Sequence, residues 1–167
     1  MDKMFFIGTL HKGLTNLQEL EELILSYNPD LLGLEITHKD LISNNVSHYP
    51  NEMIFALELA KKHKMKFFGF DSDIKVMNDD VDEENILIEQ KELIKKNNWK
   101  DFNKLNLTKK LNQISKPLFN QEKWEERELE MEQNILKNIN NEKSIVLTGV
   151  GHIDFFKKKF PNSKFLY

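Results

Sequence analysis

Two four-residue motifs place a histidine three residues after a glycine, and each follows a short apolar run. GTLH ends at His11 after residues 4–7, and GVGH ends at His152 after residues 145–147. Apolar runs that stop at glycine are typical of buried strands. If the strands are parallel, both turns emerge at the carboxyl edge of one sheet, where α/β proteins bind ligands. An imidazole there suits metal ligation or acid–base catalysis. The alternative is that each histidine only caps its turn.

Carboxylates accompany two further predicted strands. Glu35 interrupts the apolar run 31–36, while Asp71 and Asp73 follow the run 66–70. An unpaired carboxylate is costly to bury, so Glu35 is expected to face the crevice as a metal ligand or base, unless it lies on an exposed edge. Aspartates after strands are common helix N-caps. That role is favoured for Asp73, whereas both roles stay open for Asp71.

Arg127 is the single arginine among the 24 basic residues. A chain that otherwise uses lysine indicates a position that needs the planar guanidinium, for example to bind a carboxylate or an anionic intermediate. Arg127 lies three residues after Trp124 and four before Met131, so it shares the apolar face of a helix and points inward, as does Glu128. The alternative is a chance surface arginine.

These residues need a framework of alternating strands and helices. Periodicity predicts helices at 14–27, with Thr15 as N-cap, and at 51–63, 121–140 and about 155–160, strands at the runs above and at 164–167, and a loop at 37–50. Residues 79–120 are charged and rich in asparagine, and their apolar spacing predicts one or two amphipathic helices. The alternation predicts a single α/β domain spanning 1–167, with three layers, a mostly parallel sheet covered by helices on both faces, and a helical insertion at about 79–120.

Composition excludes several classes of protein. The 167 residues, 40% of them hydrophobic, suffice for one domain with a real core, and a formal charge of −3 gives no general attraction to nucleic acid. No apolar run is long enough for a membrane segment or a signal peptide, so we expect a cytoplasmic protein. The absence of cysteine excludes disulfides, thiolate catalysis and cysteine-ligated metals. Any metal would need histidine, aspartate or glutamate.

The order of four motifs resembles that of a known superfamily. GTLH at 8–11, NPDLLGLE at 28–35, WEERELEM at 124–131 and GVGH at 149–152 are similar to motifs of the TraB/PrgY, GumN and Tiki superfamily, which has distant erythromycin-esterase-like and ChaN-like relatives. The resemblance implies an α/β fold in which paired Gly-x-x-His turns, a glutamate and an arginine form one site.

The resemblance also implies a chemistry. Tiki-type members are proposed metal-dependent proteases, esterase-like members are proposed to use a histidine base without metal, and TraB/PrgY members inhibit peptide pheromone signals. By position, His11, Glu35 and His152 become the ligand or base set, and Arg127 binds the substrate or the oxyanion.

We therefore expect a peptidase-like hydrolase that acts on a peptide or small acyl substrate. In this hypothesis His11, Glu35 and His152 hold a divalent ion (zinc, manganese or cobalt) that lowers the pKa of bound water, and Arg127 stabilises the tetrahedral intermediate; Glu35, His11 and Arg127 are the catalytic residues. One alternative is a metal-free hydrolase in which Glu35 orients His11 as general base. Another is a protein that sequesters a peptide or small ligand without turnover. The insertion is expected to be a lid or the surface of a homodimer.

Overall fold

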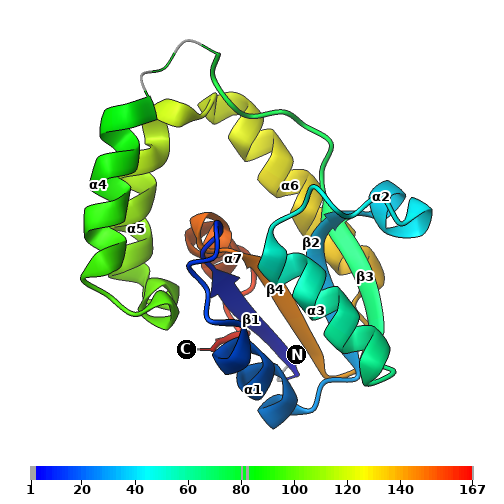
Figure 1. Cartoon of the computed structure of the whole chain (residues 1–167). Helices are drawn as coiled ribbons and strands as arrows, with labels where there is room; N and C mark the ends of the chain where they lie inside the picture. Colours follow the sequence, from blue (N-terminus) through cyan, green and yellow to red (C-terminus); the bar gives the residue numbers. More distant parts are fainter. Residues whose placement is uncertain (1–2, 80, 82, 167) are drawn as a thin grey trace.

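The computed structural model describes residues 3–79, 81 and 83–166 and contains a five-stranded sheet whose paired strands are all parallel (Figure 1). The strand order is β3-β2-β4-β1-β5. The strands are β1 (Met4–Thr9), β2 (Leu31–Thr37), β3 (Lys66–Asp71), β4 (Ser144–Gly149) and β5 (Lys164–Phe165). The α-helices are α1 (Leu17–Tyr27), α2 (His38–Ser43), α3 (Asn51–Lys62), α4 (Glu83–Lys95), α5 (Leu105–Ser115), α6 (Gln121–Asn138) and α7 (Ile153–Lys159). Short 3₁₀ helices are η1 (Trp99–Asn103), η2 (Lys116–Leu118) and η3 (Val150–His152).

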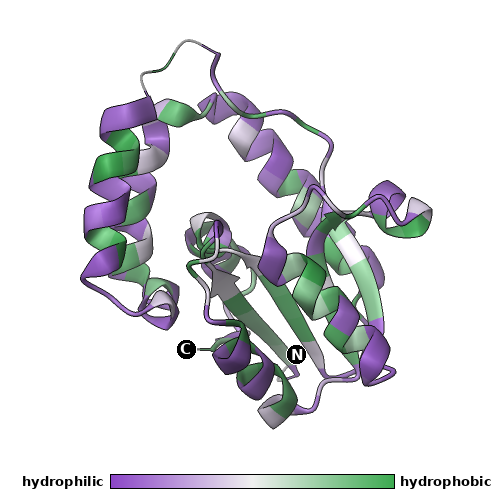
Figure 2. Ribbon diagram, viewed as in Figure 1, coloured by the Kyte–Doolittle hydropathy of each residue, from purple (hydrophilic) through white to green (hydrophobic). Residues whose placement is uncertain are grey.

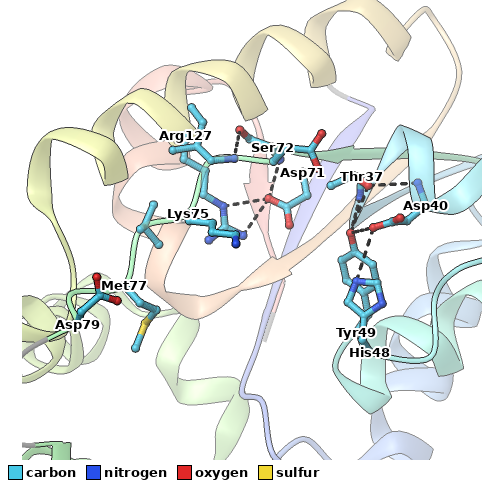
Figure 3. Close-up of a pocket in the computed structure, with 13 residues that line it drawn as sticks. Thr37, Asp40, His48, Tyr49, Asp71, Ser72, Lys75, Met77, Asp79 and Arg127 are labelled. Carbon is cyan, nitrogen blue, oxygen red and sulfur yellow. Dashed lines mark hydrogen bonds and ion pairs between the residues drawn. The ribbon is translucent and has the colours of Figure 1, made fainter.

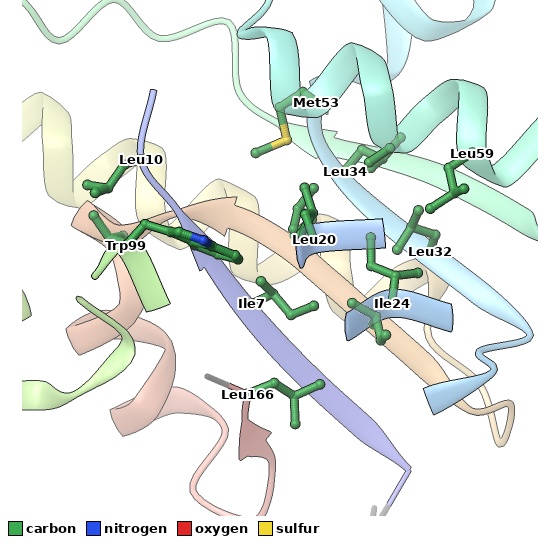
Figure 4. Close-up of a cluster of buried hydrophobic side chains, with 14 of the residues drawn as sticks. Ile7, Leu10, Leu20, Ile24, Leu32, Leu34, Met53, Leu59, Trp99 and Leu166 are labelled. Atoms are coloured by element: carbon green, nitrogen blue, oxygen red, sulfur yellow. The ribbon is translucent and has the colours of Figure 1, made fainter. Parts of the chain in front are cut away.

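The strands β1, β2 and β4 are buried along their whole length, which confirms the predicted three-layer α/β fold. In β1, Phe5 and Ile7 join the core under α1 and α3, while Met4 and Phe6 join the core under α6 and α7. Successive side chains of a strand point to opposite faces, so a continuous apolar run fills two layers at once. Figure 2 shows the apolar strands between helices whose outer faces are polar, and Figure 4 shows the first of these cores.

The chain leaves the neighbouring strands β1 and β4 in opposite directions. After β1 it passes through α1 to β2 on one side, and after β4 it passes through α7 to β5 on the other. Their ends are level, since Thr9 pairs with Gly149. Such a switch in direction opens a crevice at the carboxyl ends of the two strands. The two histidine turns therefore emerge side by side, as the sequence predicted.

The predicted helical insertion consists of α4, η1 and α5. Helices α4 and α5 pack against each other away from the sheet, and η1 returns to contact β1 (Figure 1). Trp99 of η1 is buried and its indole N–H donates to Glu19 of α1 at 2.9 Å. The contacts of η1 thus hold the insertion against the domain.

Two predicted boundaries are wrong for identifiable reasons. Helix α1 begins at Leu17 with Asn16 as its N-cap, because the Thr15 hydroxyl instead bonds both the N–H and the C=O of Leu10. The predicted loop at 37–50 contains α2, which Thr37 caps by accepting the N–H of Asp40. None of the helices in the described part of the chain has the length and apolar character that a membrane span requires.

Candidate functional site

The four predicted site residues meet at the carboxyl edge of the sheet. Glu35 Oε1 lies 3.5 Å from His152 Nε2 and 3.2 Å from Arg127 Nη2. His11 approaches across Gly149, where a Cβ atom would lie 3.0 Å from His11 Nε2 and 3.6 Å from Glu35 Oε2. Residues from β2, α6 and both turns therefore form one cluster around the Glu35 carboxylate.

Glu35 is a buried carboxylate that accepts hydrogen bonds at both oxygens. Oε2 accepts from the Thr148 hydroxyl and from the Gly149 N–H, each at 2.6 Å, and Oε1 accepts from Arg127. Burial favours the neutral acid, but the charge and hydrogen bond of His152, together with Arg127, outweigh burial and lower the pKa of Glu35 well below its ordinary value. Glu35 is ionised and fully hydrogen-bonded.

His152 lies between two carboxylates. Its Nδ1 is 2.9 Å from Glu128 Oε1, its Nε2 faces Glu35, and the Trp124 ring stacks on it at 4.6 Å between centroids. Burial disfavours the charged imidazole, but Glu35 and the hydrogen bond to Glu128 outweigh burial and raise the pKa of His152 to about 9. At neutral pH His152 is an imidazolium with both N–H groups directed at carboxylates.

His11 has a different environment, because its side chain is 44% exposed. Its Nδ1 lies 2.5 Å from Oε1 of Glu52, which is buried in the first turn of α3 and also accepts from the Thr9 hydroxyl at 3.4 Å. Loss of solvent opposes protonation, but Glu52 and the charge of Glu35 outweigh it and raise the pKa of His11. No described residue bonds its Nε2. The arrangement is a carboxylate–imidazole pair with one free ring nitrogen.

Arg127, the single arginine, points into the site and pairs with the carboxylates of Glu35 and Asp71. The sequence predicted an inward-facing arginine that binds a carboxylate or an anionic intermediate. Its Nε and Nη2 donate to Asp71 Oδ1 at 3.0 and 2.8 Å, so Asp71 belongs to the cluster. Burial and the charge of Glu35 raise the pKa of Asp71 against the opposing effect of Arg127. Asp73 is exposed, and no helix begins there, so its predicted N-cap role is wrong.

The motif glycines permit close approach and do not form the turns. The φ of Gly149 is −61°, and among the described residues Gly13 is the glycine with positive φ, at 74°. A Cβ at Gly8 would lie 2.8 Å from Ile153, and one at Gly149 would contact the His11 ring. At both positions neighbouring side chains occupy the space of a Cβ: those of Ile153 and Asn103 at Gly8, and the half-exposed His11 ring at Gly149.

A cleft of about 1750 Å³ opens over the cluster. The insertion and α6 contribute apolar side chains to its lining, and the four site residues lie in the same cleft. These apolar side chains include Leu87, Ile94, Leu111, Phe119 and Trp124. A pocket of about 460 Å³ adjoins it, with the Arg127–Asp71 pair on one wall and Tyr49 hydrogen-bonded to Asp40 on another (Figure 3).

The donor set does not fit a divalent metal ion. Metal ligands must offer free lone pairs, whereas Glu35 already accepts three hydrogen bonds and both ring nitrogens of His152 lie against carboxylates. The Arg127 guanidinium adds positive charge at the same carboxylate. Among the described residues, no three His, Asp or Glu side chains are grouped as metal ligands. The predicted set of His11, Glu35 and His152 is therefore assembled but hydrogen-bonded to protein groups.

Glu52 was not predicted as a site residue. Its side chain is 1% exposed, whereas Ile54, two residues later on the same helix, is only half-buried. The signal was present, since Glu52 shares a helical face with Ala56 and Ala60, both fully buried.

Comparisons with known proteins add little. No protein-family model matches the chain, and no curated protein matches it. Among solved structures, that of the type III effector HopBA1 is similar, with a TM-score of 0.43 and 16% identity over 90% of this chain and 67% of that chain. A likeness of this size carries no conclusion about function.

Proposed function

We propose that this protein is a hydrolase of acyl substrates in which His11, paired with Glu52, is the general base and no metal ion takes part. The observation that carries the proposal is the exposed His11 imidazole, which lines the cleft with Nδ1 fixed by a buried carboxylate and Nε2 not bonded by any described residue. Histidine in this setting is the commonest protein base near neutral pH. This function is the metal-free alternative predicted from the sequence, except that Glu52, and not Glu35, orients His11.

The reaction needs two proton transfers, one from water to His11 and one from His11 to the leaving group. His11 Nε2 takes a proton from a water molecule while the water oxygen bonds the carbonyl carbon of the substrate, and the carbonyl oxygen becomes an oxyanion. The intermediate then collapses, the acyl–leaving-group bond breaks, and the proton on His11 passes to the leaving group. Glu52 keeps the Nδ1 proton in place and stabilises the imidazolium that forms, as a buried carboxylate does in catalytic triads.

Arg127 is the candidate group for stabilising the oxyanion. Nε and Nη2 are used by Asp71 and Glu35, and Nη1 has no hydrogen bond to a described residue. A guanidinium carries five N–H donors, so Arg127 keeps donors for the substrate while its position stays fixed. Glu35 thereby acts as the anchor that holds Arg127 and His152.

The test is a screen of p-nitrophenyl esters and short peptides with wild type, His11→Gln, Glu52→Gln and the exposed control His63→Gln. We expect kcat/KM to fall about 10²–10⁴-fold in both site variants and to stay unchanged in the control. We also expect kcat/KM to rise with pH through a pKa above the ordinary histidine value of 6.5, because the base must lose its proton. Full activity in His11→Gln, or activity lost in chelator and restored by zinc, would overturn the proposal.

The second candidate is a protein that sequesters its ligand without turnover. The cleft, at about 1750 Å³, exceeds the roughly 300–1,000 Å³ typical of small-molecule sites, which favours a peptide or another large ligand. Ligand binding read from Trp124 fluorescence, with no product formed by wild type at any pH, would support this function. Membership of the TraB/PrgY, GumN and Tiki superfamily stays a proposal.

A further inference from the structure

The two histidine turns share a feature that the reaction above does not use: each is hydrogen-bonded by an asparagine of the insertion. Asn103, at the end of η1, is fully buried, and its side-chain amide bonds both backbone groups of Gly8. Oδ1 accepts the Gly8 N–H at 2.5 Å and Nδ2 donates to the Gly8 carbonyl at 2.9 Å. Asn103 therefore contacts the strand end from which the His11 turn begins.

Asn103 supplies the hydrogen bonds that a neighbouring strand would otherwise make with Gly8. Among the described residues, β5 pairs with β1 only at Phe5 and Phe6, and the last bond on that side runs from the Leu166 N–H to the Phe6 carbonyl at 2.8 Å. Backbone groups two residues apart in a strand point to the same side, so those of Gly8 face the space beyond the end of β5. Buried backbone groups need partners, and an asparagine amide supplies one acceptor and one donor.

Gly8 is the residue that permits this contact. A Cβ at position 8 would lie 2.9 Å from Asn103 Oδ1, closer than ordinary contacts allow. Lys157 of α7 donates in turn to the Asn103 carbonyl at 2.5 Å. The asparagine is thus held between β1 and the helix that follows the second turn.

Asn112 of α5 makes the corresponding contact with the second turn. Its Nδ2 donates to the Gly151 carbonyl at 2.8 Å, directly before His152. Gly151 also lies against Trp124, whose ring stacks on the His152 imidazole. Displacing this carbonyl would change how His152 sits between Trp124 and Glu35.

We propose that Asn103 and Asn112 are positioning residues, through which the docked insertion sets the placement of His11 and His152 relative to Glu35. The insertion is then a structural part of the site as well as a wall of its cleft. The catalytic consequence rests on the proposed function, whereas the effect on the two imidazoles does not.

The test is two-bond ¹H–¹⁵N NMR of the imidazoles in protein labelled at its five histidines. Asn112→Ala is compared with Asn97→Ala, a matched control, because Asn97 is another half-buried insertion asparagine whose Nδ2 donates to a backbone carbonyl at 2.8 Å, that of Leu93. We expect the His152 signals to move in Asn112→Ala and to stay in place in Asn97→Ala. His152 signals in folded Asn112→Ala that coincide with those of the control would overturn the proposal.

Asn103 is tested in the same way by Asn103→Ala, which is expected to move the His11 signals. Asn103→Asp serves where the alanine variant does not fold, because it keeps the shape and an acceptor for the Gly8 N–H but loses the donor to the Gly8 carbonyl. Unmoved His11 signals in the folded variant would count against a positioning role for Asn103.

Kinetics supply a separate readout. We expect the folded Asn103 variant to lower kcat about tenfold with KM within about twofold of wild type, since a small displacement of His11, the proposed base, reduces the rate while ground-state binding persists. If wild type hydrolyses nothing but the imidazole signals move as expected, the hydrolase proposal fails and the positioning proposal stands. If activity is present and the signals do not move, the reverse holds.

Discussion

The two Gly-x-x-His turns have the same motif and opposite environments. His11 is 44% exposed and pairs with one carboxylate, Glu52, whereas His152 is 3% exposed and lies between Glu35 and Glu128. One imidazole keeps a nitrogen without a partner among the described residues, and the other uses both nitrogens to hold carboxylates. The shared motif places each histidine at the carboxyl edge of the sheet. The residues around each histidine then determine whether it is available for chemistry or stabilises the fold.

The contrast predicts that Glu35 matters most for stability. Glu35→Gln removes the anion that His152 and Arg127 share, and breaking a buried ion pair typically costs about 3–5 kcal/mol of unfolding free energy. Urea denaturation measures the loss, with the exposed Glu126→Gln of α6 as control. An unfolding free energy equal to that of the control would show that the Glu35 cluster is not a stabilising unit.

The two histidines should respond differently to the same substitution. His152→Gln is expected to lose about 1.5–3 kcal/mol of unfolding free energy, because it removes charge-assisted hydrogen bonds to buried carboxylates. His11→Gln is expected to lie within about 0.5 kcal/mol of wild type while activity falls. Thermal melts and kinetics on the same preparations compare them, and equal destabilisation of both variants would contradict the division of roles.

Stability should also depend on pH through His152. Its pKa rises from 6.5 to about 9 on folding, so the native state binds an extra proton between these values. The unfolding free energy is therefore highest below pH 6.5 and falls towards pH 9, with a slope approaching about 1.4 kcal/mol per pH unit. The lowered pKa of Glu35 predicts a second loss below its ordinary value of 4.5. Because the pKa of His11 is also raised, denaturation at several pH values should show a larger decrease of the alkaline slope in His152→Gln than in His11→Gln.

Gly149→Ala is expected to change activity more than stability. The new Cβ would lie 3.0 Å from His11 Nε2, and this half-exposed ring has room to move, so unfolding free energy should change by less than about 1 kcal/mol. Activity should nevertheless fall, because the displaced nitrogen is the proposed base. Kinetics and imidazole NMR check this, and an unchanged kcat with a displaced His11 signal would argue against His11 as the base.

The fold was largely predictable because its signals are local. Continuous apolar runs at β1, β2 and β4 distinguish strands buried on both faces from helices with one apolar stripe, and the two turns, Glu35 and Arg127 followed from strand ends and helix spacing.

The unpredicted parts of the site depend on packing between distant elements. Glu52 reaches His11 only because the first turn of α3 lies beside the end of β1, and Asn103 reaches Gly8 only because β5 is two residues long. The protonation of His152 likewise depends on Glu128 and Glu35 arriving from separate elements. The spacing of residues within one helix or strand does not reveal contacts between elements that are distant in the sequence.

The strand order has a consequence for how the chain folds. β1 pairs only with β4 and β5 among the described strands, and Met4 is matched to Ser144 near the other end of the chain. During synthesis the first strand therefore stays with both hydrogen-bonding edges open until β4, which begins at Ser144, has been made. Such distant pairings slow folding and leave an apolar strand exposed to aggregation in the interval. Completing the sheet is thus a late event, and the crevice that holds both histidines forms in the same step.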